Sequence, residues 1–397
     1  MIGGKSVAKL FCMLLAVCAV ALFGIMPGAR LAAQSTGAVY VLSNQPVENA
    51  VIVFHRNADG TLLPGGSFPT GGAGFGSGPN PLGSQGALML SADNRLLFAV
   101  NAGSDSITSF SVAGDSLTAL QTVPSGGTMP VSLTVYKDML YVLNSGGASP
   151  NITGFRITPE AHQAKLLAPI PGSTQFLPNS SAAAAAEISF TPDGGSLLVT
   201  EPAVNQIVSF TVGSGGHAAP AGTFSASGAG SSASAGGGPF GLAFSRDIVV
   251  TANTAGDTPQ AGSMSSYAVL PSGELAPASP AVMNNQTAST WALIAEKVSL
   301  ALTTNTVSGT ISSFAIAPKT GTLTLIQSAA ASILAPDGST LNPSDMALSS
   351  EGRFLYVRNG ANGTVSAFAL QANGSLRPLA QTQVSSLPDT AAGIAAR

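Results

Sequence analysis

The sequence predicts an all-β fold, a seven-bladed β-propeller of four-stranded antiparallel blades that is closed by its C-terminal strand. Three observations support this prediction. The chain is rich in turn formers, with 46 Gly and 26 Pro. A short motif recurs seven times at intervals of about fifty residues. The last segment of the chain resembles the strand that the first repeat lacks.

The composition favours short strands over long helices. Hydrophobic residues make up 45% of the 397 residues, and charged residues only 8%, whereas roughly a quarter of the residues in ordinary globular domains are charged. Abundant Gly and Pro suit many short strands joined by tight turns. A disordered chain would lack the regularly spaced apolar runs that this sequence contains.

Residues 1–33 are predicted to be a signal peptide. Lys5 and Lys9 precede an uncharged apolar run, Leu10 to Met26, and Ala32 and Ala33 follow it, as in secretory signals. The run is about 17 residues long, at the lower limit for a membrane span, so an uncleaved anchor is the alternative. We expect cleavage, no membrane span afterwards, and a secreted or periplasmic protein.

Removal of this segment limits the chemistry of the mature chain. Cys12 and Cys18 both lie in it, so no disulfide, Cys–metal site or Cys nucleophile would remain. Cleavage also removes three cations, and the mature chain becomes more acidic than the formal net charge of −3. No basic stripe is left to bind a phosphate backbone, which argues against nucleic acid as a partner.

The repeated motif consists of an apolar residue, two mostly small residues and an aromatic residue. Its aromatic members are Phe54, Phe110, Phe155, Phe210, Tyr267, Phe314 and Phe368. Seven copies at about fifty residues each match the period of propeller blades.

Each repeat contains three further elements. A strand of β-formers ending in Asn precedes the motif, as in Tyr141-Val142-Leu143-Asn144, although the fourth copy ends in Glu201. A turn with Gly follows the motif, as in Gly60-Thr61-Leu62, because Gly supplies the positive φ of a tight hairpin. An inner strand and its turn, such as residues 188–194, precede the Asn strand. Four short strands in each unit are the content of one blade.

The two ends of the repeat region, residues 38–397, predict closure of the ring. The first unit starts at Val39 with its Asn strand and lacks an inner strand, and residues 389–397 resemble an inner strand without a successor. Pairing the two ends removes the exposed edge that an open array would leave. A β-sandwich, a barrel and an open solenoid are the alternatives, but none gives seven units with a permuted end.

A functional site is predicted on the face where the Asn strands end and around the channel mouth. Long inter-blade loops, residues 65–85, 168–186, 223–239 and 328–344, are expected on this face, and loops of this length are often functional. Glu187 and Asp345 come near the starts of inner strands, and Arg358 precedes Asn359.

A carboxylate pair with an Arg could activate water and hold an anionic ligand. We therefore predict Glu187, Asp345 and Arg358 as catalytic residues, and Glu201, Asn101 and Asn359 as ligand-binding residues. The alternative is that the charges are solvated or form structural ion pairs. His55, His162 and His217 lack metal-ligand spacing, so neither a metal site nor a cofactor is expected.

The repeat resembles the lactonase family of seven-bladed propellers, which includes 6-phosphogluconolactonase-like and carboxymuconate-cyclase-like proteins. The matching pieces are Thr191-Pro192-Asp193-Gly194, Leu140-Tyr141-Val142-Leu143-Asn144, Thr364-Val365-Ser366-Ala367-Phe368 and Asp59-Gly60-Thr61-Leu62. The resemblance covers residues 38–397 and implies opening or closing of a lactone ring near the channel mouth. Family members often carry Pro-Arg-His before an inner strand, where this chain has Ala185-Ala186-Glu187.

Two functional hypotheses follow. In the first, the chain is an exported lactonase-like hydrolase, with Glu187 or Asp345 as the base and Arg358 as the anion holder. In the second, it is a non-catalytic propeller that binds a glycan, peptide or surface partner through its loops. The depleted charge favours the second hypothesis and the family resemblance favours the first. We expect a monomer in either case.

Overall fold

The computed structural model divides the chain into two units, Met1–Gln34 and Ser35–Arg397. It describes residues 36–76, 78, 81–158, 167–225, 237–385 and 387–397, so the predicted signal peptide and His162 lie outside the described residues. Within these ranges there is no α-helix, and none of the helices present is long and apolar enough to cross a membrane. The helical elements are four 3-10 turns, η1 Ser181–Ala183, η2 Pro202–Val204, η3 Ala255–Asp257 and η4 Glu296–Val298.

The second unit consists of seven antiparallel sheets, numbered here as blades 1 to 7 in chain order and written from the inner strand outward. Blade 1 contains β29 (Ala392–Ala396), β1 (Gly37–Leu42), β2 (Ala50–Arg56) and β3 (Leu62–Pro69). Blade 2 contains β4 (Leu88–Leu90), β5 (Leu96–Asn101), β6 (Ser106–Ala113) and β7 (Ser116–Pro124). Blade 3 contains β8 (Pro130–Tyr136), β9 (Met139–Asn144) and β10 (Asn151–Ile157), with β11 (Leu167–Pro169) and β12 (Gln175–Phe176) both pairing with β10.

The other four blades follow the same order. Blade 4 contains β13 (Glu187–Phe190), β14 (Ser196–Glu201), β15 (Gln206–Val212) and β16 (Ala218–Ser225). Blade 5 contains β17 (Pro239–Ser245), β18 (Ile248–Asn253), β19 (Ser263–Val269) and β20 (Leu275–Met283). Blade 6 contains β21 (Ser289–Ala295), β22 (Leu300–Asn305), β23 (Thr310–Ile316) and β24 (Leu323–Ser332). Blade 7 contains β25 (Pro343–Leu348), β26 (Phe354–Asn359), β27 (Thr364–Leu370) and β28 (Leu376–Ser385).

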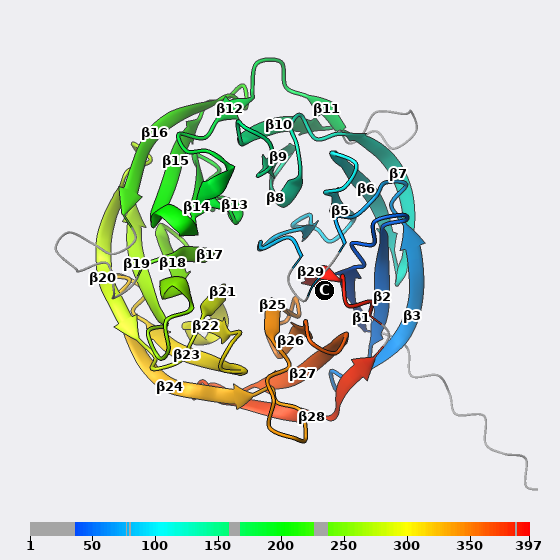
Figure 1. Cartoon of the computed structure of the whole chain (residues 1–397), viewed down its shortest axis with the longest axis vertical. Helices are drawn as coiled ribbons and strands as arrows, with labels where there is room; N and C mark the ends of the chain where they lie inside the picture. The colour runs from blue at the N-terminus through cyan, green and yellow to red at the C-terminus, as the bar shows by residue number, and fades with distance from the viewer. Residues whose placement is uncertain (1–35, 77, 79–80, 159–166, 226–236, 386) are drawn as a thin grey trace, which may run out of the picture. The chain divides into compact units, whose positions relative to one another are not determined.

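The blades form a closed ring (Figure 1). Each inner strand contacts the inner strand of the next blade, in the order β29, β4, β8, β13, β17, β21, β25 and back to β29. The last strand completes blade 1, because Ile394 of β29 pairs with Val41 and Ala395 pairs with Tyr40. The predicted seven-bladed fold and its closure by the C-terminal strand are therefore confirmed.

The repeated residues hold neighbouring blades together. All seven motif aromatics, from Phe54 to Phe368, are at most 3% exposed. Gly273, at φ 82°, accepts a hydrogen bond on its carbonyl from Ser209 Oγ of the preceding blade at 2.6 Å. Gly321, at φ 71°, accepts the equivalent bond from Ser266 Oγ at 2.7 Å. The Gly turns thus allow the hairpin conformation and also connect one blade to the next.

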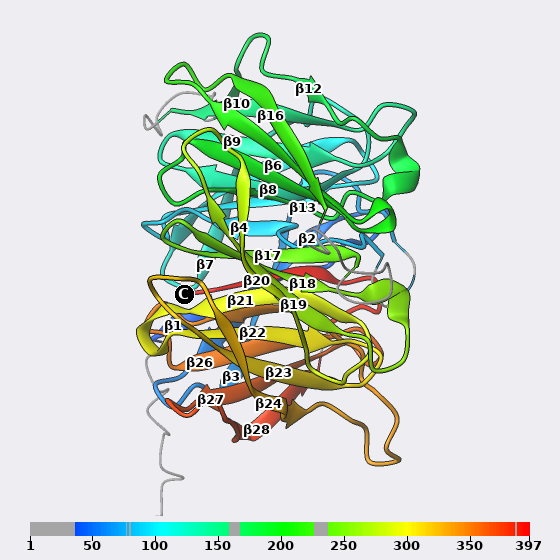
Figure 2. The same cartoon turned by 90° about the vertical axis from the view of Figure 1, so that its left-hand side faces the viewer.

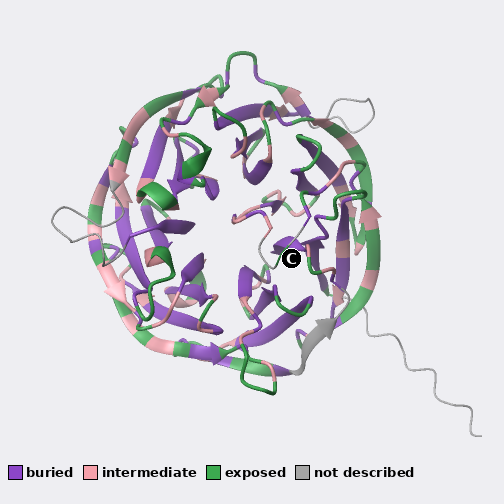
Figure 3. Cartoon of the chain, in the orientation of Figure 1, coloured by how far each residue is buried: buried purple, intermediate pink, exposed green. Residues whose placement is uncertain are grey.

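The strands run between two faces of the ring (Figure 2). We call the face where the second strand of each blade ends the loop face; it carries the connections between second and third strands and between blades. The opposite face, with the connections between first and second and between third and fourth strands, is called the turn face. Burial is concentrated in the inner and middle strands, while the outer strands are mostly intermediate or exposed (Figure 3). A functional site is therefore expected on one of the two faces or in the channel between the inner strands.

Candidate functional site

A cavity of about 450 Å³ lies along the inner strands β4, β25 and β29. At one end it is lined by Ser91, Asn94 and Ser350, which belong to turn-face connections. Glu187 and Asp345 also line it. The fold therefore brings two of the three predicted catalytic residues to one cavity, although they are far apart in the sequence.

Glu187 is the first residue of β13 and is only 5% exposed. The backbone N–H of Leu242, in β17, donates a hydrogen bond to Glu187 Oε2 at 2.5 Å, so this side chain connects blades 4 and 5. Burial raises the pKa of Glu187 well above its usual value; the bond from Leu242 opposes the rise and the charge of Asp345 adds to it. The burial of Glu187 therefore favours its protonated form.

Asp345 is the extra residue of a bulge in β25, between Ser344 and Met346. Its φ of 57° is in the left-handed region, which Asp tolerates better than most residues. The N–H of Met346 donates to Asp345 Oδ1 at 2.9 Å. Burial raises the pKa of Asp345 to about 7, while the Arg358 cation and the backbone amides of Met346 and Ile394 oppose the rise. Asp345 therefore changes charge near neutral pH.

Arg358 lies in β26, directly opposite Ser344 in the sheet, and is 2% exposed. Burial lowers its pKa to about 10, and the charge of Asp345 opposes this shift, so Arg358 remains a cation at neutral pH. Asp345 is among the described residues that line the cavity and Arg358 is not. This placement favours an action of Arg358 through Asp345 over direct contact with an anionic substrate.

Glu201 is separate from this group. It ends β14 at the loop face, is fully buried, and accepts a hydrogen bond on Oε2 from Asn179 Nδ2 at 2.6 Å. Burial raises the pKa of Glu201, and the bond from Asn179 opposes the rise. The structure thus places this predicted ligand-binding residue in a polar contact between a loop and a strand end, away from the 450 Å³ cavity.

Asn101 and Asn359 are also fully buried at strand ends. The Nδ2 of Asn359 donates to Thr364 Oγ1 at 2.7 Å and to Ser366 Oγ at 2.8 Å. Asn101 makes equivalent bonds and also accepts from Asn49 and Thr70 of blade 1 and its following loop. These bonds account for the repeated Asn as a connection between the second and third strands. Ligand binding by either residue stays a prediction.

Gln85, which the sequence did not single out, reaches across the channel on its loop-face side. Its Nε2 donates to the carbonyls of Leu242 at 3.1 Å and Ala292 at 2.9 Å, and its Oε1 accepts from the N–H of Ala292 at 3.0 Å. Ser84 accepts from Trp291 Nε1 at 3.0 Å. The connection between blades 1 and 2 is therefore fastened to blades 5 and 6 on the far side of the ring, so that it crosses the channel.

The contacts of Gln85 extend to Glu187. Leu242 accepts from Gln85 on its carbonyl and donates to Glu187 from its N–H. A Cβ at Gly241 would lie 2.4 Å from Gln85 Oε1, so this position requires Gly for the crossing segment to fit. Sequence reasoning missed Gln85 because it lies in a long loop without repeat periodicity; the only signal was the length of that loop.

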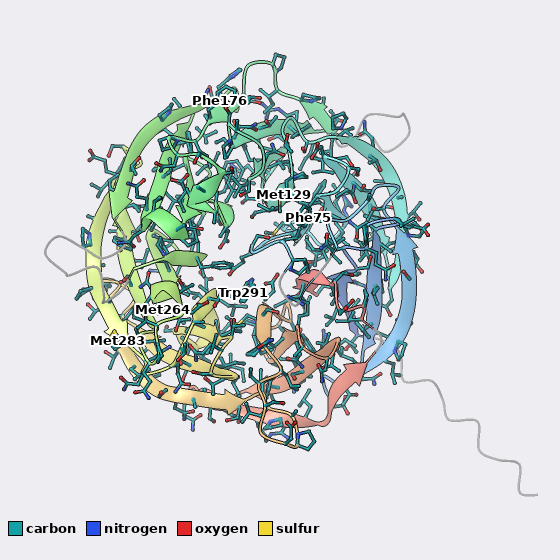
Figure 4. The ribbon with its side chains drawn as sticks, in the orientation of Figure 1. Phe75, Met129, Phe176, Met264, Met283 and Trp291 are labelled. Atoms are coloured by element: carbon teal, nitrogen blue, oxygen red, sulfur yellow. The ribbon has the colours of Figure 1, made fainter. Side chains whose placement is uncertain are left out.

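A second cavity, of about 620 Å³, opens on the loop face between blades 4, 5 and 6. Small residues such as Ala203, Gly238 and Ala255 line much of it, together with Thr290 and Thr306. Asp257 is the one charged residue among the described residues that line it. Trp291 is 1% exposed beside Phe240 at the inner edge of blade 6 (Figure 4).

Charges are divided unevenly between the two faces. Every Lys and Arg in the part of the chain that the structure describes lies at the turn-face ends of strands or in turn-face connections, except for the buried Arg358. Arg95, Lys137 and Arg246 are examples. The described residues contain no cluster of three or more His, Cys, Asp or Glu side chains that could hold a metal ion.

The fold and its charged central cavity define the chain as a closed seven-bladed propeller with an acidic group inside. The family model described as "Lactonase, 7-bladed beta-propeller" matches residues 32–172 and 291–388. The chain therefore belongs to the seven-bladed β-propeller lactonase family. The matched segments include Asp345 and Arg358 but not Glu187 or Glu201.

Solved structures share the fold of this chain. A Bacteroides fragilis protein, provisionally described as a 6-phosphogluconolactonase, has a TM-score of 0.66 and 17% identity and covers 92% of this chain and 99% of its own. A Lactobacillus plantarum protein has a TM-score of 0.67 and 17% identity, with 91% and 99% covered. The periplasmic gluconolactonase of Pseudomonas aeruginosa has a TM-score of 0.62 and 16% identity, with 90% and 98% covered. No curated protein matches the sequence.

Proposed function

We propose that this chain is an exported lactonase that opens a sugar lactone or carboxy-lactone in the central cavity. The observation that carries this proposal is the meeting of two carboxyl groups, Glu187 and Asp345, at one cavity in the channel. Burial raises the pKa of both carboxyls, that of Asp345 to about 7, and a carboxyl whose pKa lies near the working pH is suited to general acid–base catalysis.

In the proposed reaction, ionised Asp345 accepts a proton from a water molecule whose oxygen forms a bond to the lactone carbonyl carbon. The bond from this carbon to the ring oxygen then breaks, and protonated Glu187 gives its proton to the departing oxygen. Leu242 already bonds Glu187 Oε2, which leaves Oε1 for the substrate. Proton return from Asp345 to Glu187 through solvent restores the pair, and the product is a hydroxy acid.

Arg358 has a positioning role in this reaction, because its charge opposes the rise in the pKa of Asp345. Since Gln85 and its neighbours cross the channel on the loop-face side, substrate would enter from the turn face. Export is proposed from the predicted signal peptide, and a mature protein that retains Met1 would contradict cleavage.

The test is hydrolysis of a panel of sugar lactones and carboxy-lactones by the purified mature protein, measured above the spontaneous rate. Asp345→Asn and Glu187→Gln should each lower kcat/KM by roughly 100-fold or more, the usual contribution of general acid–base catalysis. The matched control is Glu48→Gln, an exposed carboxylate of the loop face. Wild-type rates in both cavity variants, or no hydrolysis of any lactone, would refute the proposal.

Loop-face binding is the second candidate function, and the 620 Å³ cavity between blades 4, 5 and 6 favours it. In this alternative the propeller binds a glycan, peptide or surface partner there without catalysis. The two functions use opposite sides of the segment that crosses the channel. A protein without lactonase activity that still binds a partner through the loop face would support this second function.

A further inference from the structure

The loop face is acidic, and its charges are of one sign. The exposed carboxylates Glu48, Asp105, Asp257, Asp337 and Asp389 lie in its connections. None of the described Lys, Arg or His residues lies there. Hydrogen bonds from the hydroxyl and N–H of Ser339 lower the pKa of Asp337, so this carboxylate stays ionised at neutral pH. An uncompensated acidic surface attracts cationic partners.

The same face exposes large apolar side chains. Val47 is 93% exposed, Phe176 64%, Val307 51% and Phe75 49%, and Val204 and Leu334 are also exposed. Figure 4 shows Phe75 towards the centre of the ring and Phe176 at its rim. Single exposed apolar residues are ordinary, but a set of them on one face together with uncompensated charge is typical of an interaction surface.

The 620 Å³ cavity lies within this surface. Val307 and Asp257 both line it, so an apolar side chain and a carboxylate are presented to the same occupant. Asp257 is the last residue of the 3-10 turn η3, has a φ of 59° and is exposed. A Lys or Arg side chain combines an aliphatic stem with a cationic end, which matches this lining better than an anionic or wholly polar ligand does.

We propose that the loop face docks a basic protein segment, one that carries Lys or Arg next to apolar side chains and places one basic side chain in the cavity at Asp257. This inference rests on the second proposed function, loop-face binding, and is independent of lactone hydrolysis. Charge complementarity selects this partner, because an anionic lipid surface or a nucleic acid would be repelled by the same carboxylates.

The test uses the mature chain and a fluorescent synthetic peptide of alternating Lys and Leu residues, with a Glu–Leu peptide as the charge-reversed probe. The Lys–Leu peptide should bind, and added salt should weaken its binding. The triple variant Asp105→Asn, Asp257→Asn, Asp337→Asn should raise its Kd by roughly 10-fold or more, which corresponds to about 1.4 kcal/mol. Val307→Ser should also raise the Kd.

The matched control removes three carboxylates from the turn face, through Asp247→Asn, Glu274→Gln and Glu296→Gln, and should change the Kd by less than about 2-fold. Equal losses of affinity for the Lys–Leu peptide in the two triple variants would overturn the proposal. Binding of the Glu–Leu peptide with the same Kd as the Lys–Leu peptide would overturn it as well. Self-association of the chain that the loop-face triple abolishes would assign the face to a second copy and would also overturn it. Lactone hydrolysis at the wild-type rate in the loop-face triple would show that the two sites are independent.

Discussion

Two kinds of buried polar group occupy the strand ends of this propeller, and they differ in how often they recur. An Asn ends the second strand of blades 2, 3, 5, 6 and 7, whereas Glu201 ends that of blade 4 and Asn44 follows the end of β1 in blade 1 by two residues. In blades 2, 5, 6 and 7 its Nδ2 donates to two hydroxyl groups of the following strand. The group of Glu187, Asp345 and Arg358 occurs once. Glu187 and Asp345 lie in the inner strands of blades 4 and 7, and Arg358 lies in the second strand of blade 7.

The two kinds of group also differ in the free energy that their burial costs the folded protein. A neutral amide whose Nδ2 donates to nearby hydroxyl groups brings no charge into the interior, so a chain can repeat it in most blades at a low cost. Buried ionisable groups whose pKa values are shifted by burial destabilise the protein unless a partner compensates them. A costly group that departs from the repeat is therefore a candidate for function, whereas the repeated Asn serves the geometry of the blade.

The largest effect should come from Arg358, because it is the buried cation next to Asp345. Arg358→Met should lower the free energy of unfolding by about 3–5 kcal/mol, the usual cost of removing one member of a buried charge pair. The loss should be larger at pH 8 than at pH 6, since Asp345, whose pKa is about 7 in the folded protein, is more fully ionised at the higher pH. Chemical denaturation at both pH values measures it.

The control for this variant is Arg353→Met, which removes an exposed Arg of the turn face and should cost less than about 0.5 kcal/mol. In the double variant with Asp345→Asn, the additional loss caused by Arg358→Met should shrink. An Arg358→Met protein as stable as the wild type would contradict this prediction. Burial of the charged group would then cost the fold as little free energy as burial of the repeated Asn side chains.

The second effect is a dependence of stability on pH. The pKa of Asp345 rises from an ordinary 3.8 to about 7 on folding, so the folded state binds more protons than the unfolded state between these values. The stabilising contribution of this proton binding by Asp345 is fully present below about pH 4 and is lost as the pH rises to about 7. Its size is about 4 kcal/mol for a shift of this order. Asp345→Asn should remove this loss, so that the variant gains stability relative to the wild type as the pH rises.

The measurement is the difference in unfolding free energy between variant and wild type from pH 4 to pH 8. The difference is needed because Asp59, Asp93 and Asp193 have lowered pKa values and contribute a slope of the opposite sign. Glu48→Gln is the control and should give a flat difference. A flat difference for Asp345→Asn as well would contradict the raised pKa.

The sequence could predict the ring because the fold is repeated in it. The aromatic from Phe54 to Phe368 and the Gly turns recur about every fifty residues, and each recurrence is independent evidence for the same blade. Glu187 and Asp345 could be selected as carboxyls near the starts of inner strands. Their proximity depends on ring closure, and the left-handed φ of Asp345 depends on a bulge that no local pattern reveals.

Other parts of the site could not be read from the sequence. Gln85 acts through backbone groups of Leu242 and Ala292 on distant blades, and backbone hydrogen bonds leave no signature in residue identity. The uneven distribution of Lys and Arg between the two faces follows from their positions in the sequence. It could be recognised only after the structure had assigned each turn to a face. The buried positions of Asn101 and Arg358 differ from the exposed channel mouth that the loop-based reasoning expected.

The smallest of the three effects concerns Asn101 and separates the two kinds of polar group. Asn101→Ala removes hydrogen bonds to Asn49, Thr70, Ser106 and Thr108 and leaves buried partners unsatisfied, which should cost about 2 kcal/mol. Gln45→Ala, in an exposed loop, is the control and should cost less than about 0.5 kcal/mol. If Asn101 only connects strands, the variant should keep the wild-type KM for a lactone and the wild-type Kd for the Lys–Leu peptide at a temperature where it is fully folded. A raised KM or Kd under those conditions would instead support the predicted ligand-binding role, and would place function in a repeated residue as well as in the singular charged group.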